Sequence, residues 1–168
     1  MITKNGRHIT LKKQGFKDAI FTGISGVHYV ISELSRRGLV AMATIRNTAG
    51  IDVVVTDGRN FHANIQVKSS SKKATHFALG KKPVPVSGHL YYAFVRWLKN
   101  EDRYEVFLET SARVRKVAEE VRAKDIQHHI KIFGDNYFFV IRGEFAKNVS
   151  RLKRNWERFG LKNKNQVL

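Results

Sequence analysis

A hairpin between residues 51 and 68 constrains the fold of this chain more than any other feature of its sequence. Residues Phe61 to Lys68 alternate between apolar and polar side chains, which is the pattern of a strand with one buried face. The β-branched run Ile51 to Val55 predicts a second strand, buried on both faces. The intervening residues Asp57 to Asn60 form a hairpin turn signal, so we expect the two strands to be neighbours in one sheet.

Further helices and strands are predicted on both sides of this hairpin. Apolar residues recur at three- and four-residue steps from Phe21 to Arg37, which predicts a helix with a basic last turn, closed by Gly38. The other predicted elements are strands at Leu39–Ala43, Leu90–Leu98 and Tyr104–Leu108, a helix at about Ala112–Lys124, an extended pair at Ile126–Phe133 and Tyr137–Ile141, and a helix at about Phe145–Phe159. This order predicts an α/β fold of three layers, in which helices flank a central mixed β-sheet.

The length of the chain predicts one folded domain. Its 168 residues, 42% of them hydrophobic, are enough for a single core and too few for two ordinary domains. We expect a basic arm at residues 1–16, the domain at 17–161 and a basic tail at 162–168. The absence of cysteine excludes disulfides and thiolate zinc sites. Since no signal-peptide pattern or membrane-length apolar run is present, we expect a cytoplasmic protein that does not enter a membrane.

The strong positive charge predicts a polyanionic partner. Lysine and arginine number 31 against 14 acidic residues, a formal net charge of +17. Such an excess repels itself in a small domain, and binding to a polyanion relieves the repulsion. Nucleic acid, DNA above all, is the partner that we expect. An anionic membrane surface and a simply well-solvated surface are the alternatives.

The basic residues are also clustered. The stretch from Lys68 to Lys82 contains no acidic residue, which favours phosphate contacts over a loop that is merely solvated. The residues that we expect to bind nucleic acid are Lys72, Lys73, Lys81, Lys82, Arg36 and Arg37.

Polar residues interrupt the two hairpin strands where catalytic chemistry could occur. Asp52 breaks the apolar run Ile51 to Val55, and a carboxylate there is costly unless it is paired or bound to a metal. Gln66 and Lys68 lie two residues apart and therefore point to the same face of their strand. A carboxylate and an amide oxygen can hold a divalent ion, and an ammonium group can position water and offset phosphate charge. The alternative is that Gln66 and Lys68 lie on the solvated face of an edge strand.

This pattern resembles the PD-(D/E)XK nuclease superfamily, which has the restriction-endonuclease-like fold. The resemblance is to a bacterial subgroup of small members in which the last strand motif is Gln-x-Lys. The segments that carry it, in order, are Gly23 to Val30, Glu33 to Gly38, Arg46 to Asp52, Ile65 to Ser70 and Asn155 to Leu161. The resemblance implies a metal-dependent nuclease acting on DNA, with Asp52, Gln66 and the Val67 carbonyl binding Mg²⁺ or Mn²⁺ and Lys68 assisting the attacking water. It also implies a homodimer.

One position departs from the family pattern. The family has a glutamate after the glycine of its first helix, whereas Val27 follows Gly26 here and cannot bind a metal. His28 and Glu33 are close in sequence, but on a helix neither is expected to share the direction of Val27. A catalytically weak or inactive nucleic-acid-binding protein on the same fold is therefore the second hypothesis. A basic partner of an acidic protein is the third.

Overall fold

The structure is a computed structural model that describes residues 3–4, 7–8, 15–45, 50–70, 77–98, 101–133 and 139–141. Within these ranges, side chains are described for residues 20–45, 50–70, 77–98 and 101–123. The helix predicted at Phe145–Phe159 and the tail predicted at residues 162–168 lie outside the described residues.

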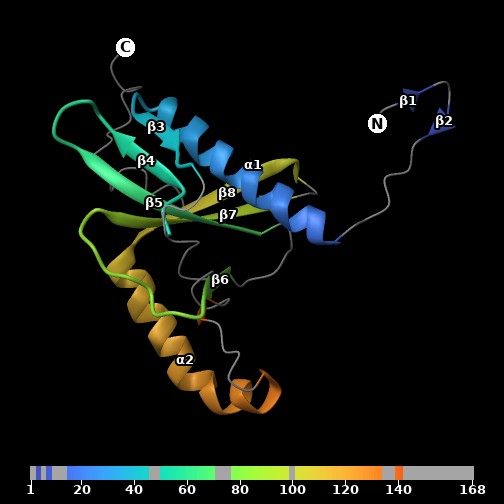
Figure 1. The fold of residues 1–168 in the computed structure, drawn as a ribbon, viewed down its shortest axis with the longest axis vertical. Coiled ribbons are helices and arrows are strands. Elements are labelled where there is room, and N and C mark those ends of the chain that lie inside the picture. The colour runs from blue at the N-terminus through green and yellow to red at the C-terminus, as the bar shows by residue number, and fades with distance from the viewer. Residues whose placement is uncertain are drawn as a thin grey trace.

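A five-stranded mixed sheet forms the centre of the fold (Figure 1). Its strands, in spatial order, are β3 (Val40–Ala43), β4 (Val53–Thr56), β5 (His62–Ser70), β7 (Leu90–Leu98) and β8 (Arg103–Thr110). The central pair β5 and β7 is parallel, and the other neighbours are antiparallel. The predicted mixed sheet is therefore confirmed.

The predicted hairpin is formed by β4 and β5. Val53 is opposite Ile65 in the register, and the Asp57 carboxylate accepts hydrogen bonds from the turn N–H groups of Arg59 and Phe61 at 2.8 and 3.0 Å. The expected alternation is confirmed, because the apolar side chains of β5 are buried in the core. The expectation that the preceding strand is buried on both faces is wrong, since Val54 is only half-buried.

Helix α1 (Gly15–Ser35) covers one face of the sheet, and its Val30 and Leu34 are fully buried against the strands. It begins earlier than predicted, so its first residues fall in the expected basic arm, which also contains the two-residue strands β1 (Thr3–Lys4) and β2 (Arg7–His8). The helix ends before Arg36, so the predicted basic last turn is wrong. Gly38 follows in the left-handed conformation, with φ of 81°.

Helix α2 (Ser111–Phe133) begins on the opposite face and extends away from the sheet (Figure 1). The Thr110 hydroxyl accepts a hydrogen bond from the N–H of Arg113 at 3.4 Å, which confirms the predicted capping at this end. Val114 is buried in a second apolar cluster on this face, so α1, the sheet and the start of α2 form three layers.

The extended pair predicted near the end of the chain is wrong. Residues Ile126 to Phe133 belong to α2, and β9 (Phe139–Ile141) pairs instead with β6 (Phe77–Gly80), which lies between β5 and β7 in the chain. None of the helices in the described ranges is long and apolar enough to cross a membrane.

Candidate active site

Asp52 lies immediately before β4 and is fixed against β5 by two hydrogen bonds. Its N–H donates to the Ile65 carbonyl at 2.9 Å, and its carboxylate oxygen Oδ2 accepts from the Val67 N–H at 2.7 Å. The carboxylate thus accepts the hydrogen bond that a backbone carbonyl would accept if the pairing of β4 with β5 continued past Val53. The N–H and C=O of one residue point to the same side of an extended strand, so the Val67 carbonyl also points to the side of Asp52.

Gln66 lies on β5 between Ile65 and Val67, the two residues whose backbones bind Asp52. Its side-chain amide lies against Gly50, where an added Cβ would be 3.8 Å from Nε2 and 3.9 Å from Oε1. Gly50 has φ of 74°, a conformation that glycine adopts without strain. The turn at Gly50 therefore brings the chain back over the Gln66 amide as it approaches Asp52.

Lys68 and Tyr92 both lie within electrostatic range of Asp52. Burial lowers the pKa of Lys68, and the negative charge of Asp52 opposes this change. Burial raises the pKa of Tyr92, and the charge of Asp52 raises it further. Tyr92 is the β7 partner of Gln66 and is 1% exposed, so it is a buried neighbour of the polar residues of β5.

A pocket of about 380 Å³ opens beside Asp52. Asp52 and Val67 line its sheet side. Its other side is formed by α1, through Ile20, Gly23, Ile24, Val27 and His28. Val27 therefore faces the same space as Asp52, at the position where the family resemblance places a glutamate.

The close packing of α1 on the sheet depends on Gly26. A Cβ added at Gly26 would lie 1.9 Å from Ser69 Oγ, a distance that real Cβ atoms essentially never show, and 3.0 Å from Ser69 Cβ, which is tighter than most real Cβ contacts. Gly26 is buried, and the next two residues of α1 line the pocket. The absence of a side chain at position 26 thus determines how closely Val27 and His28 approach Asp52.

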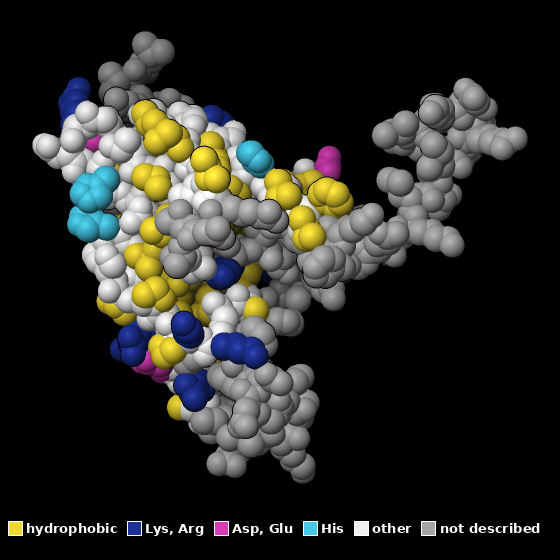
Figure 2. Space-filling view, viewed as in Figure 1, with side chains coloured by type: hydrophobic (Ala, Val, Ile, Leu, Met, Phe, Trp, Pro, Cys, Tyr) yellow, Lys and Arg dark blue, Asp and Glu magenta, His cyan; other side chains and the backbone are white. Residues whose placement is uncertain are grey.

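The basic residues expected to bind nucleic acid are distributed unevenly around this site. Lys81 and Lys82 are exposed just after β6, and Figure 2 shows Lys and Arg side chains gathered over the part of the molecule where Figure 1 places β6 and the start of α2. Arg36 and Arg37 each pair with Glu33, at 3.0 and 2.6 Å, and lie just beyond the end of α1, at least eight residues after the pocket residues of that helix. Lys72 and Lys73 lie outside the described residues.

Three features of the site were missed from the sequence. His28 lines the pocket, although its helical position was expected to point elsewhere. One helical step rotates the side chain by about 100°, and a pocket this wide still admits both Val27 and His28. Tyr92 is buried, and nothing in the sequence predicted its proximity to Asp52. The contact of Gly26 with β5 also has no local sequence signal.

The polar groups of this site fit a divalent cation with mainly oxygen ligands. Among the described side chains, no three His, Asp or Glu residues gather in one place, so Asp52 is the single carboxylate of the pocket. The Gln66 amide and the Val67 carbonyl are neutral oxygens of the kind that hard cations accept. A metal held by one carboxylate needs further oxygen ligands, which water or a substrate phosphate can provide.

Comparisons with known proteins yielded one structural neighbour. No family model and no curated protein matches the sequence. A solved structure of a bacterial homing endonuclease aligns with a TM-score of 0.35 and 16% sequence identity. The alignment covers 52% of this chain and 63% of that one, so the chain spans less than two thirds of its neighbour. A likeness at this level does not establish a shared family.

Proposed function

We propose that this protein is a metal-dependent nuclease that hydrolyses phosphodiester bonds in DNA. The observation that carries the proposal is the position of the Asp52 carboxylate, which is held just before β4 by the N–H of Val67, the residue next to Gln66 in β5, and lies within electrostatic range of Lys68. Phosphodiester hydrolysis can use such a combination of anionic oxygen, neutral oxygen and cation, and of these residues Asp52 and Val67 line the pocket. The net charge of +17 supports a polyanionic substrate.

Each polar residue has a separate role in the proposed reaction. Asp52, Gln66 and the Val67 carbonyl would hold Mg²⁺ or Mn²⁺, which when bound polarises the phosphate and lowers the pKa of a coordinated water. Lys68 would donate hydrogen bonds to the attacking water or to a phosphate oxygen, and its charge would offset the charge that develops on phosphorus. Tyr92 would exclude water from the sheet side of the site.

Lysine substitutions separate DNA cleavage from DNA binding. Lys68→Met retains the length of the side chain and removes its charge, so it should abolish cleavage while DNA binding changes little. Lys82→Met is the matched control, since Lys82 is exposed, follows β6 and is not part of the hairpin strands. It should retain cleavage. If Lys82 contacts one phosphate, the slope of the logarithm of the DNA-binding constant against the logarithm of the salt concentration should become shallower by about 0.9. Equal cleavage by wild type and Lys68→Met would contradict the proposed role of Lys68.

A non-catalytic DNA-binding protein is the second candidate function, and Val27 is the observation that favours it. Val27 presents an apolar side chain to the pocket where a second carboxylate would strengthen metal binding. This candidate predicts binding to DNA with steep salt dependence and no cleavage with either metal. The expected homodimer is a separate proposal, which sedimentation of the full chain with and without DNA would test.

A further inference from the structure

The pocket beside Asp52 contains one more side chain that can bind a metal ion. Four of the α1 residues that line it, Ile20, Gly23, Ile24 and Val27, have no side-chain atom that could serve as a ligand. His28 does, and it lies on the side of the pocket opposite the sheet residues Asp52 and Val67. Two metal-binding side chains from separate elements, one imidazole and one carboxylate, therefore face the same space.

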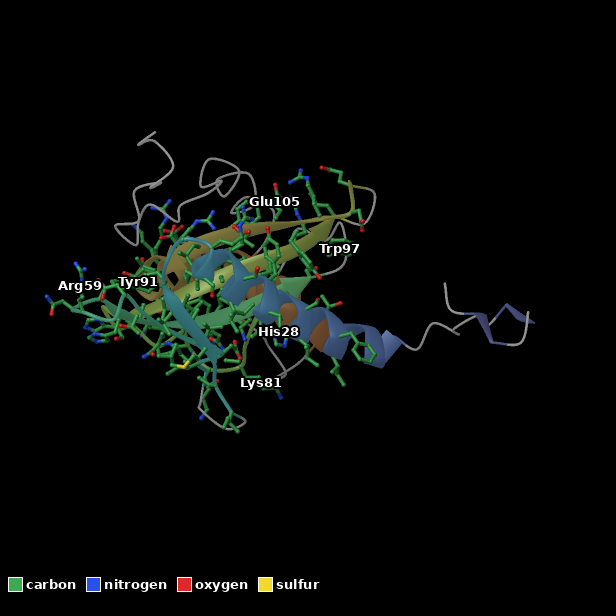
Figure 3. All side chains as sticks on the ribbon, turned by 90° about the horizontal axis from the view of Figure 1, so that it is seen from above. His28, Arg59, Lys81, Tyr91, Trp97 and Glu105 are labelled. Atoms are coloured by element: carbon green, nitrogen blue, oxygen red, sulfur yellow. The ribbon has the colours of Figure 1, made fainter. Side chains whose placement is uncertain are left out.

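The imidazole of His28 is available for a ligand. The side chain is exposed, and among the described residues no hydrogen bond, ion pair or ring contact engages it. In Figure 3, His28 and Lys81 lie on one side of the view, whereas Glu105 and Trp97 lie on the other. Because Gly26 packs α1 tightly against Ser69, the backbone that carries His28 is fixed relative to β5.

We propose that His28 is a metal-binding residue, whose imidazole binds a divalent transition-metal ion together with the Asp52 carboxylate. This inference rests on the proposed nuclease function and specifies the metal that the site prefers. His28 would provide from α1 the ligand that Val27 cannot provide.

The chemistry of the two ligands determines the metal preference. Mg²⁺ is a hard ion that favours oxygen ligands and nearly ideal octahedral geometry. Imidazole nitrogen binds first-row transition metals more readily, and Mn²⁺, which favours carboxylate oxygen, belongs to that series and accepts an imidazole more readily than Mg²⁺ does. A site with one carboxylate and one imidazole therefore binds Mn²⁺ more tightly than Mg²⁺, and its Mn²⁺ affinity depends more strongly on His28.

The test measures metal binding by the full chain without DNA. Mn²⁺ and Mg²⁺ are titrated calorimetrically into wild type, His28→Ala and His89→Ala. His89 is the matched control, because it is exposed and stacks on His62, with ring centroids 4.3 Å apart, at the other end of β5. We expect His28→Ala to weaken Mn²⁺ binding by about tenfold or more, while Mg²⁺ binding changes less. His89→Ala should bind both metals as wild type does.

A spectroscopic measurement provides an independent result. Paramagnetic Mn²⁺ should broaden the ring resonances of His28, assigned by their absence in His28→Ala, at concentrations that leave those of His89 sharp. Unchanged Mn²⁺ affinity in His28→Ala, or His28 resonances that stay sharp, would overturn the inference. That outcome would leave the nuclease proposal intact, because the Asp52 and Lys68 variants test cleavage separately.

Discussion

Replacing Gly26 with alanine tests the contact that positions α1 over the candidate site. The added Cβ would lie 1.9 Å from Ser69 Oγ, 3.0 Å from Ser69 Cβ and 3.5 Å from Val95 Cβ. An unstrained carbon contact is about 3.5–4.0 Å, so α1 must move away from β5 or Ser69 must move. Overpacking of this kind costs about 1–3 kcal/mol of folding free energy.

Gly23→Ala is the matched control for this prediction. Gly23 lies one helical turn before Gly26 in α1, and no atom lies within 4 Å of a Cβ added there. Both substitutions gain about 1 kcal/mol of helix propensity, so their difference isolates the overpacking cost. We expect Gly26→Ala to be less stable than Gly23→Ala by about 1–3 kcal/mol.

Urea unfolding followed by circular dichroism measures both variants, with m-values compared to confirm the same unfolding reaction. Adding Ser69→Ala to Gly26→Ala should recover part of the loss, because it removes the nearest contact and leaves the Cβ contact at 3.0 Å. Ser69 Oγ is buried and has no hydrogen-bond partner among the described residues, so its removal forfeits no hydrogen bond there. Equal stability of Gly26→Ala and Gly23→Ala would refute the close packing of α1 on β5.

Four further substitutions have definite expected outcomes. Arg96→Ala leaves the carboxylate of Glu105, which is 9% exposed, without its paired guanidinium, and should lower the free energy of unfolding measured in urea by about 1.5–3 kcal/mol. Arg103→Ala breaks an exposed ion pair and should cost less than about 1 kcal/mol. Equal losses would count against a special role for the partly buried pair of Arg96 and Glu105. Two backbone hydrogen bonds lower the pKa of Asp57, so its stabilisation is present above the ordinary carboxyl pKa and is lost as pH falls through the lowered value. Asp57→Ala should therefore reduce the urea midpoint at pH 7 and converge with wild type in acid, whereas a difference that persists unchanged in acid would rule out this linkage. Val27→Glu adds a second carboxylate to the pocket and should strengthen Mg²⁺ binding measured by calorimetry. Unchanged Mg²⁺ affinity would show that the side chain at position 27 is directed away from Asp52.

Local patterns predicted the part of the fold that carries the site. Alternation along Phe61 to Lys68 and the turn at Asp57 together specify which strands are neighbours and which residues are opposite each other. The hairpin places Asp52 beside Ile65 and Val67, the residues that flank Gln66, so this neighbourhood could be predicted from the sequence. The catalytic roles of these residues remain a prediction, because geometry does not measure cleavage.

Long-range pairing could not be predicted in the same way. Nothing local in the sequence shows that β5 and β7 are parallel neighbours, or that Phe77 and Ile141 are paired through β6 and β9. The stretch Ile126 to Phe133 contains apolar residues at both two- and four-residue steps, so its pattern fits a strand as well as the helix that it forms. His28 was excluded by the direction of an ideal helical position, which does not take into account the width of the pocket.

A DNA cleavage assay with wild type and Asp52→Asn tests the central claim most directly. Asparagine retains an oxygen that can accept the hydrogen bond from the Val67 N–H, so the variant removes the charge and leaves the fold intact. Single-stranded, duplex and branched DNA are incubated with Mg²⁺, Mn²⁺ or EDTA, and DNA binding is measured in parallel. We predict cleavage by wild type that requires metal, and no cleavage by Asp52→Asn despite equal DNA binding. Equal cleavage by both proteins, or DNA binding by wild type without cleavage in either metal, would contradict the claim that this site hydrolyses phosphodiester bonds.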